Sequence, residues 1–349
     1  MSTQPGTVIL FGSGETAPSG RRVYDELFAS LRAPIRGAIL ETPAGFEPNS
    51  AWVAQQVADF WTMRLPNYRP QISIIPARKK ETPYSPDNPE LLTPLYTANV
   101  IFVGAGSPTY AVRQLSDTLA WQLLRAAHQQ GAAVLFASAS TLAASRYTIP
   151  VYEIYKVGEE LHWRDGLDFF GAYGLELIFV PHWNNTDGGA VLDTGKCYLG
   201  QSRFDQLRAM LPSYTATIVG IEEHTALWVE VATATCRVLG QGSVVLLKGD
   251  TTVSFCTGTE FPITELGAFH VIPNDDLPSH IIAEIQHARA ALAGTTPTPN
   301  ANIVALAESR QSARQAKEWQ RADALRDQLI ALGWQVQDTP DGAVLIPIE

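Results

Sequence analysis

The chain is poor in cysteine, in long apolar runs and in basic residues. Its three cysteines, Cys197, Cys236 and Cys256, have no paired spacing, so neither a disulfide framework nor a zinc knuckle is predicted. No apolar run approaches the roughly 18 residues of a membrane helix, and no membrane span is expected. Acidic residues outnumber basic ones by 35 to 25, and the formal net charge of −10 argues against a general nucleic-acid binder.

The first residues also lack the basic region of a signal peptide. Residues 1–5 lead directly into a strand-like run at 7–11, so a cleaved signal is not expected and a cytoplasmic location is predicted. The 349 residues, 46% hydrophobic and 17% charged, are enough to bury a sizeable core.

Short apolar runs alternate with amphipathic stretches in the first half of the chain. The predicted strands are residues 8–11, 38–40, 72–75, 100–103 and 133–136, and helical periodicity is found at 21–31, 50–60 and 111–130. This alternation predicts an α/β fold, a three-layer sandwich with a mostly parallel central sheet. Four strand ends, at 12–15, 41–45, 104–108 and Ser138, carry small or special residues and should meet at one edge, where ligands bind to such sheets.

The second half of the chain has a different pattern. Close-spaced β runs at 216–221, 225–231, 235–239 and 243–247, with a turn at 240–242, predict an antiparallel extension of the main sheet. Residues 280–292 are a predicted closing helix. The small, polar and proline-rich segment 294–302 is a predicted linker, which divides a domain at 1–293 from a small helical tail at 303–349 that ends in a β-hairpin.

Ser138 is the strongest candidate for a nucleophile. The apolar run 132–136 ends abruptly in small residues, and a buried strand that turns at once into a helix raises one side chain above the sheet, as a nucleophile elbow does. The backbone amides of Ala139 and Gly106 are the natural donors to a developing oxyanion. The alternative is that Ser138 is only a small turn residue.

His182 is the candidate base, because it follows another apolar run, 177–180, at a strand end. A third residue, a carboxylate, should hold the imidazole tautomer. Glu153 is preferred, since a charge among aromatic and aliphatic residues seldom lacks a partner. The rivals on a more polar segment are Glu159, Glu160 and Asp165. Residues 220–226, which include Glu222 and Glu223, form a second candidate binding segment.

Taken in order, these motifs resemble the peptidase S51 family, the dipeptidase E and cyanophycinase group of the class I glutamine-amidotransferase-like fold. The resemblance covers about residues 7–290 and rests on the segments 11–15, 41–44, 104–113, the Ser138 turn, the pair Pro181-His182 and the segment 220–227. It implies a serine peptidase in which Ser138 is the nucleophile, His182 the base and Glu153, fifteen positions after the serine, the acid. It further implies that Arg203, in the region after the histidine, holds an acidic residue of the substrate. Asn184, Glu222 and Glu223 are further substrate-binding candidates.

The elbow departs from the family pattern, because Phe136 and Ser140 stand where the family has glycine and Thr141 where it has alanine. Two hypotheses therefore remain. The first is a serine hydrolase for a small acidic peptide or isopeptide, which needs no metal or organic cofactor. The second is a non-catalytic binding protein of the same fold whose tail docks tRNA or a protein partner.

The tail has a resemblance of its own. Residues 310–314, 317–323, 325–327, 332–333 and 338–342 resemble the C-terminal module of cysteinyl-tRNA synthetases, over about residues 303–345. The signature motifs of the synthetase core are absent, so aminoacylation is not implied. An RNA contact is one hypothesis for the basic side chains of Arg310, Arg314, Lys317, Arg321 and Arg326. The other is a solvated helix with i,i+4 ion pairs to the interspersed acids Glu308, Glu318, Asp323 and Asp327.

Overall fold

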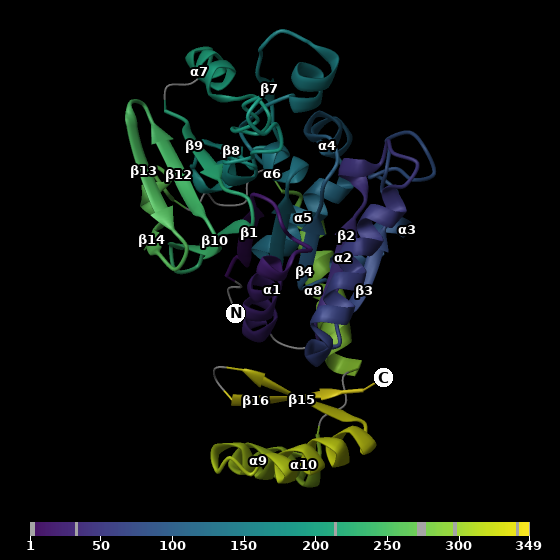
Figure 1. Ribbon diagram of the computed structural model, residues 1–349. Coiled ribbons are helices and arrows are strands. Elements are labelled where there is room, and N and C mark those ends of the chain that lie inside the picture. Colours follow the sequence, from purple (N-terminus) through teal and green to yellow (C-terminus); the bar gives the residue numbers. More distant parts are fainter. Residues whose placement is uncertain are drawn as a thin grey trace.

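The computed structural model describes residues 4–31, 34–212, 215–270, 277–295, 299–339 and 342–348. Its centre is an eight-stranded sheet with the strand order β14-β11-β10-β1-β5-β4-β2-β3 (Figure 1). The strands of this sheet are β1 (Thr7–Phe11), β2 (Arg36–Leu40), β3 (Gln71–Ile75), β4 (Val100–Val103), β5 (Ala133–Ala137), β10 (Thr225–Glu230), β11 (Thr235–Gly240) and β14 (Glu260–Pro262). The five strands from β3 to β1 are parallel, and β10, β11 and β14 extend the sheet in antiparallel fashion. The predicted α/β architecture is confirmed.

Helices cover both faces of this sheet, because alternate strand residues are apolar on both sides. On one face Ile9, Ile39 and Leu135 pack against α1 (Pro18–Ser30) and α2 (Ser50–Arg64). On the other face Leu10, Ile101 and Val134 pack against α4 (Pro108–Leu115), α5 (Leu119–Gln129) and α8 (Ser279–Thr295). The remaining short helices are α3 (Pro89–Leu92), α6 (Ala139–Ala143) and α7 (Gln201–Ala209), and the single turns are η1 (Thr42–Ala44), η2 (Pro66–Tyr68), η3 (Thr93–Tyr96), η4 (Glu153–Val157), η5 (Phe169–Tyr173) and η6 (Ile263–Glu265).

The stretch predicted as one helix, residues 111–130, contains two helices in the structure. The periodic stretch 111–130 contains α4 (Pro108–Leu115) and α5 (Leu119–Gln129). Asp117 between them has a φ of 58°, which no helical residue has. Thr118 then begins α5, since its hydroxyl accepts a hydrogen bond from the amide of Trp121 at 3.4 Å. The helix is therefore interrupted at Asp117 and capped at Thr118, although the apolar residues keep a helical spacing throughout the stretch.

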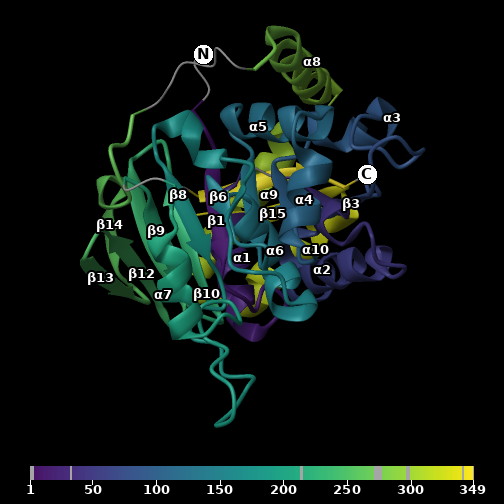
Figure 2. The same ribbon diagram turned by 90° about the horizontal axis from the view of Figure 1, so that it is seen from above.

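The predicted antiparallel extension is divided between two sheets. A separate four-stranded sheet, in the order β13-β12-β9-β8, lies beside the main one (Figure 2). Its strands are β8 (Leu177–Val180), β9 (Thr217–Ile221), β12 (Ser243–Lys248) and β13 (Thr251–Cys256), and a further pair is formed by β6 (Tyr147–Thr148) and β7 (Arg164–Asp165). The turn at 240–242 therefore connects two sheets and does not close a hairpin. Gly240 is at this change of direction with a φ of 111°. Glycine is required there, because the Cβ of any other residue would lie 2.2 Å from the carbonyl oxygen of His224.

The tail forms a small unit with its own core and is not part of the main sheet. It consists of α9 (Ala301–Gln315), α10 (Trp319–Ala331) and the antiparallel hairpin of β15 (Trp334–Thr339) and β16 (Gly342–Pro347). Ile303, Leu329 and Trp334 are buried in it. In Figure 1 the hairpin lies between the tail helices and the main domain. Residues 296–298 of the predicted linker 294–302 lie outside the described residues, and so do residues 340–341 of the predicted hairpin turn. The domain boundaries therefore stay a prediction.

None of the helices within the described ranges is long and apolar enough to cross a lipid bilayer.

The buried His128 makes the stability of the fold depend on pH. Its side chain packs against Phe169 and Tyr173, and burial lowers its pKa from 6.5 to about 4. Between these values the unfolded chain binds the proton and the folded chain does not. The stabilisation from a neutral His128 is therefore complete above pH 6.5 and is lost as the pH falls toward 4.

We expect this one residue to account for about 3 kcal/mol of the stability lost between pH 7 and pH 4. Urea unfolding of His128→Phe at both pH values should show a smaller loss than the wild type. The exposed His280 provides the control, since His280→Gln should keep the wild-type pH dependence. An unchanged pH dependence in His128→Phe would contradict the assignment.

Candidate active site

Ser138 makes the whole connection between β5 and α6. The strand ends at Ala137 and the helix begins at Ala139. Ser138 has a φ of 53° and a ψ of −112°, a conformation that L-residues other than glycine rarely adopt. A strained residue between a strand and a helix raises its side chain above the sheet edge, which is the geometry of a nucleophile elbow. The backbone of this turn is thus strained at Ser138, although the glycines of the S51 pattern are missing on either side.

Two hydroxyl groups hold this turn against the neighbouring strands. The Oγ of the buried Ser140 accepts a hydrogen bond from the amide of Ala137 at 2.8 Å and donates to the carbonyl oxygen of Val103 at the end of β4. The Oγ1 of Thr141 donates to the carbonyl oxygen of Phe11 at the end of β1, at 3.0 Å. The two residues that replace glycine and alanine thus supply hydrogen bonds that those residues cannot make.

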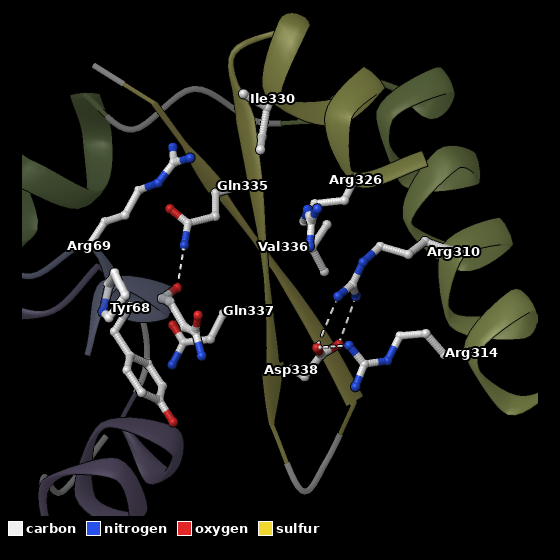
Figure 3. Close-up of a pocket in the computed structure, with 12 residues that line it drawn as sticks. Tyr68, Arg69, Arg310, Arg314, Arg326, Ile330, Gln335, Val336, Gln337 and Asp338 are labelled. Atoms are coloured by element: carbon white, nitrogen blue, oxygen red, sulfur yellow. Dashed lines mark hydrogen bonds and ion pairs between the residues drawn. The ribbon is translucent and has the colours of Figure 1, made fainter. Parts of the chain in front are cut away.

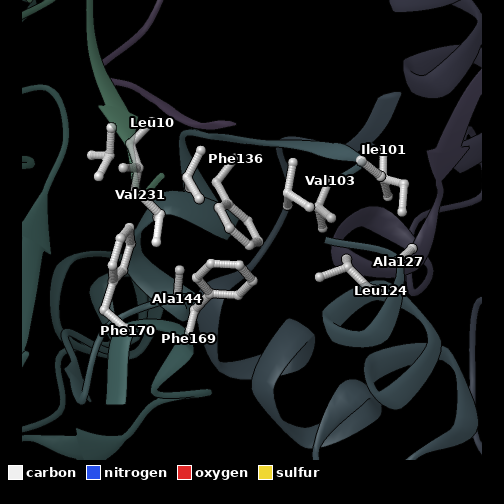
Figure 4. Close-up of a cluster of buried hydrophobic side chains, with 14 of the residues drawn as sticks. Leu10, Ile101, Val103, Leu124, Ala127, Phe136, Ala144, Phe169, Phe170 and Val231 are labelled. Carbon is white, nitrogen blue, oxygen red and sulfur yellow. The ribbon is translucent and has the colours of Figure 1, made fainter. Parts of the chain in front are cut away.

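Phe136 is accommodated because its side chain points away from the turn. It lies two residues before Ser138 on β5 and faces the core, where its ring centroid is 5.2 Å from that of Phe169 (Figure 4). The ring of Trp121 packs on it as well, with centroids 6.5 Å apart. Ring packing of this kind stabilises a core. A large residue at this position therefore does not crowd the elbow.

We expect Ser140→Ala to lower the free energy of unfolding by about 1–3 kcal/mol, because the buried amide of Ala137 and the carbonyl of Val103 lose their partner. Chemical denaturation measures this change. Ser202 on α7 is exposed, so Ser202→Ala is a matched control and should be neutral within about 0.5 kcal/mol. Equal stability of the two variants would show that the hydroxyl does not hold the turn.

His182 lies at the end of β8 with its imidazole directed at the serine. Its Nε2 is 3.2 Å from the Oγ of Ser138, within reach for proton transfer. Its backbone is also fixed: φ is 52°, and its amide donates to the carbonyl oxygen of Gly12 at 3.1 Å. The side chain is only 16% exposed, so its position is set by the protein and not by solvent.

The carboxylate beside the imidazole belongs to Glu223. Its Oε1 lies 3.0 Å from the Nδ1 of His182. Because an ionised carboxylate only accepts hydrogen bonds, Nδ1 is the protonated nitrogen, and Nε2 is left to accept the hydroxyl proton of Ser138. Ser138, His182 and Glu223 thus form one chain of hydrogen bonds with the order of a catalytic triad.

Glu153, the acid predicted from the sequence, is bonded elsewhere. Its Oε1 accepts a hydrogen bond from the hydroxyl of Thr109 at 2.5 Å, and its Oε2 is buried without a partner among the described residues. The structure thus places Glu223, and not Glu153, beside the imidazole, for a topological reason. Parallel pairing of β8 with β9 brings the residues after β9, including Glu223, next to His182, whereas the start of η4 lies against α4. The rivals Glu159, Glu160 and Asp165 follow on the segment from η4 to β7.

Asparagines after the histidine hold Glu223 in place. The side-chain amide of Asn185 donates to Glu223 Oε1 at 2.8 Å and to Asp187 Oδ2 at 3.0 Å. Asn184 Oδ1 accepts a hydrogen bond from the backbone amide of Glu223, at 2.8 Å. The hydroxyl of Tyr198 donates to the same oxygen of Asp187, at 3.0 Å. Hydrogen bonds from Asn185 and Tyr198 hold the pKa of Asp187 below its usual value.

The two predicted oxyanion donors, the backbone amides of Ala139 and Gly106, lie just after β5 and β4. Ala139 is the first residue of α6, so its N–H has no acceptor within the helix. Gly106 follows β4 in a turn, with a φ of 145°, and a Cβ there would lie 2.0 Å from the carbonyl oxygen of Pro43. Neither amide donates a hydrogen bond to any residue in the part of the chain that the structure describes.

The other predicted substrate-binding residues are engaged in the scaffold. Arg203 donates to the carbonyl oxygens of Leu199 and Tyr198, at 2.5 and 2.9 Å, and so braces the loop after His182. Glu222 Oε2 accepts from the amide of Ser243 at 2.7 Å. Together with Asn184, these side chains make hydrogen bonds that position the backbone around the site.

Two cavities flank the turn at residues 104–108. One, of about 280 Å³, is lined by Glu15, Glu41, Trp52 and Gly104, among others. Glu41 is neutralised by Arg78, 2.6 Å away. Burial raises the pKa of Glu15, while its own backbone N–H and the imidazoles of His182 and His224 act in the opposite direction.

The other cavity, of about 260 Å³, contains two arginines, Arg113 and Arg164, beside Ser107 and Glu153. The two cavities therefore differ in charge. Glu15 in the first makes no ion pair with any described residue, whereas the second holds two guanidinium groups and one carboxyl group, and Arg164 also pairs with Glu159 at 3.8 Å.

Comparison with known proteins agrees with the main-domain fold. The crystal structure of a peptidase from an acI-B1 actinobacterium superposes with a TM-score of 0.59 and 21% sequence identity, over 75% of this chain and 98% of that one. The resemblance of the fold to a peptidase is therefore confirmed.

The tail matches proteins of a different kind. The profile of the cysteinyl-tRNA ligase anticodon binding domain matches residues 297–343. The cysteine–tRNA ligase of Nitratidesulfovibrio vulgaris strain DP4 is 43% identical over 67 residues, 19% of this chain and 13% of that enzyme. The one from Beutenbergia cavernae is 65% identical over 34 residues, 10% of this chain and 7% of the ligase. The chain thus spans a small fraction of these relatives, and the resemblance of the tail is confirmed.

Sequence reasoning missed the role of Asn185 and assigned Glu223 to the substrate. A signal was present in both cases. An Asn-Asn pair follows the histidine closely, and an acidic doublet follows β9 at the same sheet edge. Only the pairing of β8 with β9 brings these two segments together.

Proposed function

We propose that the main domain is a serine hydrolase with the triad Ser138, His182 and Glu223. The observation that carries this proposal is the 3.2 Å contact between Ser138 Oγ and His182 Nε2 at a turn of positive φ. Strained backbone of this kind is kept where the surrounding structure enforces it, and it gathers at functional sites. The division into a hydrolase domain at 1–293 and a tail at 303–349 is part of the same proposal.

The reaction follows from the arrangement. Ser138 Oγ attacks the scissile carbonyl carbon while His182 Nε2 accepts its proton, and the carbonyl oxygen becomes an oxyanion held by the amides of Ala139 and Gly106. His182 then gives the proton to the leaving amine, and an acyl-enzyme remains. Water, deprotonated by the same imidazole, then attacks the ester carbon. The imidazole returns this proton to Ser138 Oγ as the ester bond breaks, which releases the acid and restores the serine. Glu223 orients the ring and stabilises its charged form throughout.

The substrate we propose is a small peptide or isopeptide with an acidic residue. The two arginines of the 260 Å³ cavity, Arg113 and Arg164, suit a carboxylate, in place of the predicted Arg203, whose Nε and Nη2 donate to backbone carbonyl oxygens. Glu15, in the cavity on the other side of the turn, suits an amino group. A substrate with one carboxylate and one amino group would therefore have a partner of opposite charge in each of the two cavities.

The test is hydrolysis of Asp-X dipeptides and of β-aspartyl-arginine, with Leu-X dipeptides as the comparison. Preferred cleavage of the acidic substrates supports the proposal, and Arg113→Ala should raise KM more than it lowers kcat. Binding of these peptides without turnover would favour the alternative, a non-catalytic binding protein.

A second proposal concerns the tail, for which the match to an anticodon binding domain favours an RNA contact. Four of the five basic residues named for this role are already in ion pairs: Arg310 and Arg314 with Asp338, Arg321 with Glu318, and Arg326 with Asp323. We therefore expect weak, salt-dependent binding of a tRNA anticodon stem-loop. Deleting residues 296–349 should abolish it, and binding retained by the truncated chain would exclude the tail as its source.

A further inference from the structure

A cavity of about 430 Å³ lies where the tail meets the main domain (Figure 3). The main domain contributes the loop of η2, residues 66–69, and the tail contributes β15 and side chains of α9 and α10. Its volume is within the range of small-molecule sites, roughly 300–1,000 Å³. The cavity is thus formed jointly by two parts of the chain that are far apart in sequence.

Two hydrogen bonds fix the walls of this cavity. The side-chain amide of Gln335 donates to the carbonyl oxygen of Asn67 at 2.6 Å, and that of the buried Gln337 donates to the carbonyl oxygen of Phe28 at 2.9 Å. Both glutamines are on β15. The tail is therefore docked by specific contacts, and the cavity between them has a defined shape.

The lining has an excess of positive charge. Four arginines face one carboxylate, Asp338, which binds Arg310 at 2.8 and 3.0 Å and Arg314 at 2.6 Å. Arg326 pairs with acids of its own helix, outside the lining. Arg69 makes no ion pair with any described residue, and Figure 3 shows it on the other side of β15 from Arg310, Arg314 and Arg326. Arginines on both sides of this strand suit an anion that reaches both.

Gln337 leaves an acceptor unused in the same wall. Its Oε1 is buried without a hydrogen-bond partner among the residues described, and the whole residue is only 3% exposed. The amide cannot be reversed, because the carbonyl of Phe28 only accepts and must face the NH₂ group. An unpaired buried acceptor is costly, so a ligand with an N–H or O–H donor would stabilise this site.

We infer that this cavity binds a phosphate-bearing ligand, with Arg69 of the main domain and the arginines of the tail on the phosphate and Gln337 Oε1 on a hydroxyl or amino group of the same molecule. A phosphate monoester, with a charge of roughly −1.5 to −2, matches the excess positive charge better than a single carboxylate does. Nucleotides combine such a phosphate with ribose hydroxyls and base amino groups. The phosphate comes from a free nucleotide or from an RNA strand; in the second case the inference rests on the proposed RNA contact of the tail.

The experiment is calorimetric titration of the full chain with inorganic phosphate, with each of the four nucleoside monophosphates and with a tRNA anticodon stem-loop. Arg69→Ala is the test variant, since the side chain is exposed and its loss should not unfold the protein. Arg64, exposed on the last turn of α2 and outside the cavity, gives the matched control Arg64→Ala.

We expect saturable binding that Arg69→Ala weakens about tenfold and Arg64→Ala leaves unchanged. Binding of a monophosphate would identify a free nucleotide as sufficient, and binding of the stem-loop alone would identify RNA as the source. The inference is overturned if no probe binds, or if both variants weaken binding equally. It is also overturned if the stem-loop binds equally to wild type and Arg69→Ala, a result that leaves the RNA contact of the tail intact.

Discussion

Ser138→Ala is expected to lower kcat for hydrolysis of an acidic dipeptide by at least about 10⁴-fold. The substitution removes the proposed nucleophile, the Oγ that lies 3.2 Å from the imidazole Nε2 of His182. Steady-state kinetics measure kcat, and calorimetry on the inactive variant measures substrate binding. The dissociation constant should change little, because the predicted contacts to the substrate's charges come from the flanking cavities.

The control for this experiment is Ser140→Ala, two residues away. It should reduce stability without removing the nucleophile, so folded enzyme should keep measurable turnover. A Ser138→Ala variant that retains activity within about tenfold of the wild type would remove this serine from the mechanism.

Glu223→Gln is expected to lower kcat by about 10³–10⁴-fold, because an amide beside Nδ1 no longer enforces the tautomer that accepts the serine proton. Glu153→Gln is the matched control, since this carboxylate bonds Thr109 and not the imidazole. Its kcat should stay within a few-fold of the wild type. The opposite ranking of these two variants in a kcat comparison at pH 7 would restore Glu153 as the acid and contradict the geometry.

The strands and two members of the site could be predicted because they depend on local sequence. Buried parallel strands are continuous apolar runs, and the residues that follow them lie at one edge of the sheet. Ser138 and His182 each follow such a run, so their places at strand ends were predictable. Their 3.2 Å contact was not, because β8 lies in the separate sheet and not beside β5.

The acid could not be predicted in the same way, because its position depends on which strands pair. Glu223 and Glu153 are both carboxylates near strand ends in the sequence. The separate sheet in which β8 pairs with β9 selects the first, and nothing local in the runs at 216–221 and 243–247 indicates that they leave the main sheet.

The elbow shows a second limit of reasoning from a pattern. From the sequence alone, Ser140 and Thr141 are expected to crowd a turn in which the S51 pattern has glycine and alanine. In the fold their hydroxyls bond the carbonyls of Val103 and Phe11, at the ends of the two strands that flank β5. A small turn can thus be held by hydrogen bonds where the family relies on glycine.

The central claim, that Ser138 is a nucleophile activated by His182, is tested most directly by labelling with a fluorophosphonate and locating the adduct by mass spectrometry. The probe phosphonylates an activated serine and releases fluoride, and it needs no knowledge of the substrate. We predict a single adduct on Ser138 in the wild type and in Glu153→Gln, and none in Ser138→Ala or His182→Ala. No adduct on the folded wild-type protein, an adduct on another residue, or labelling of Ser138 that is unchanged in His182→Ala would contradict the account.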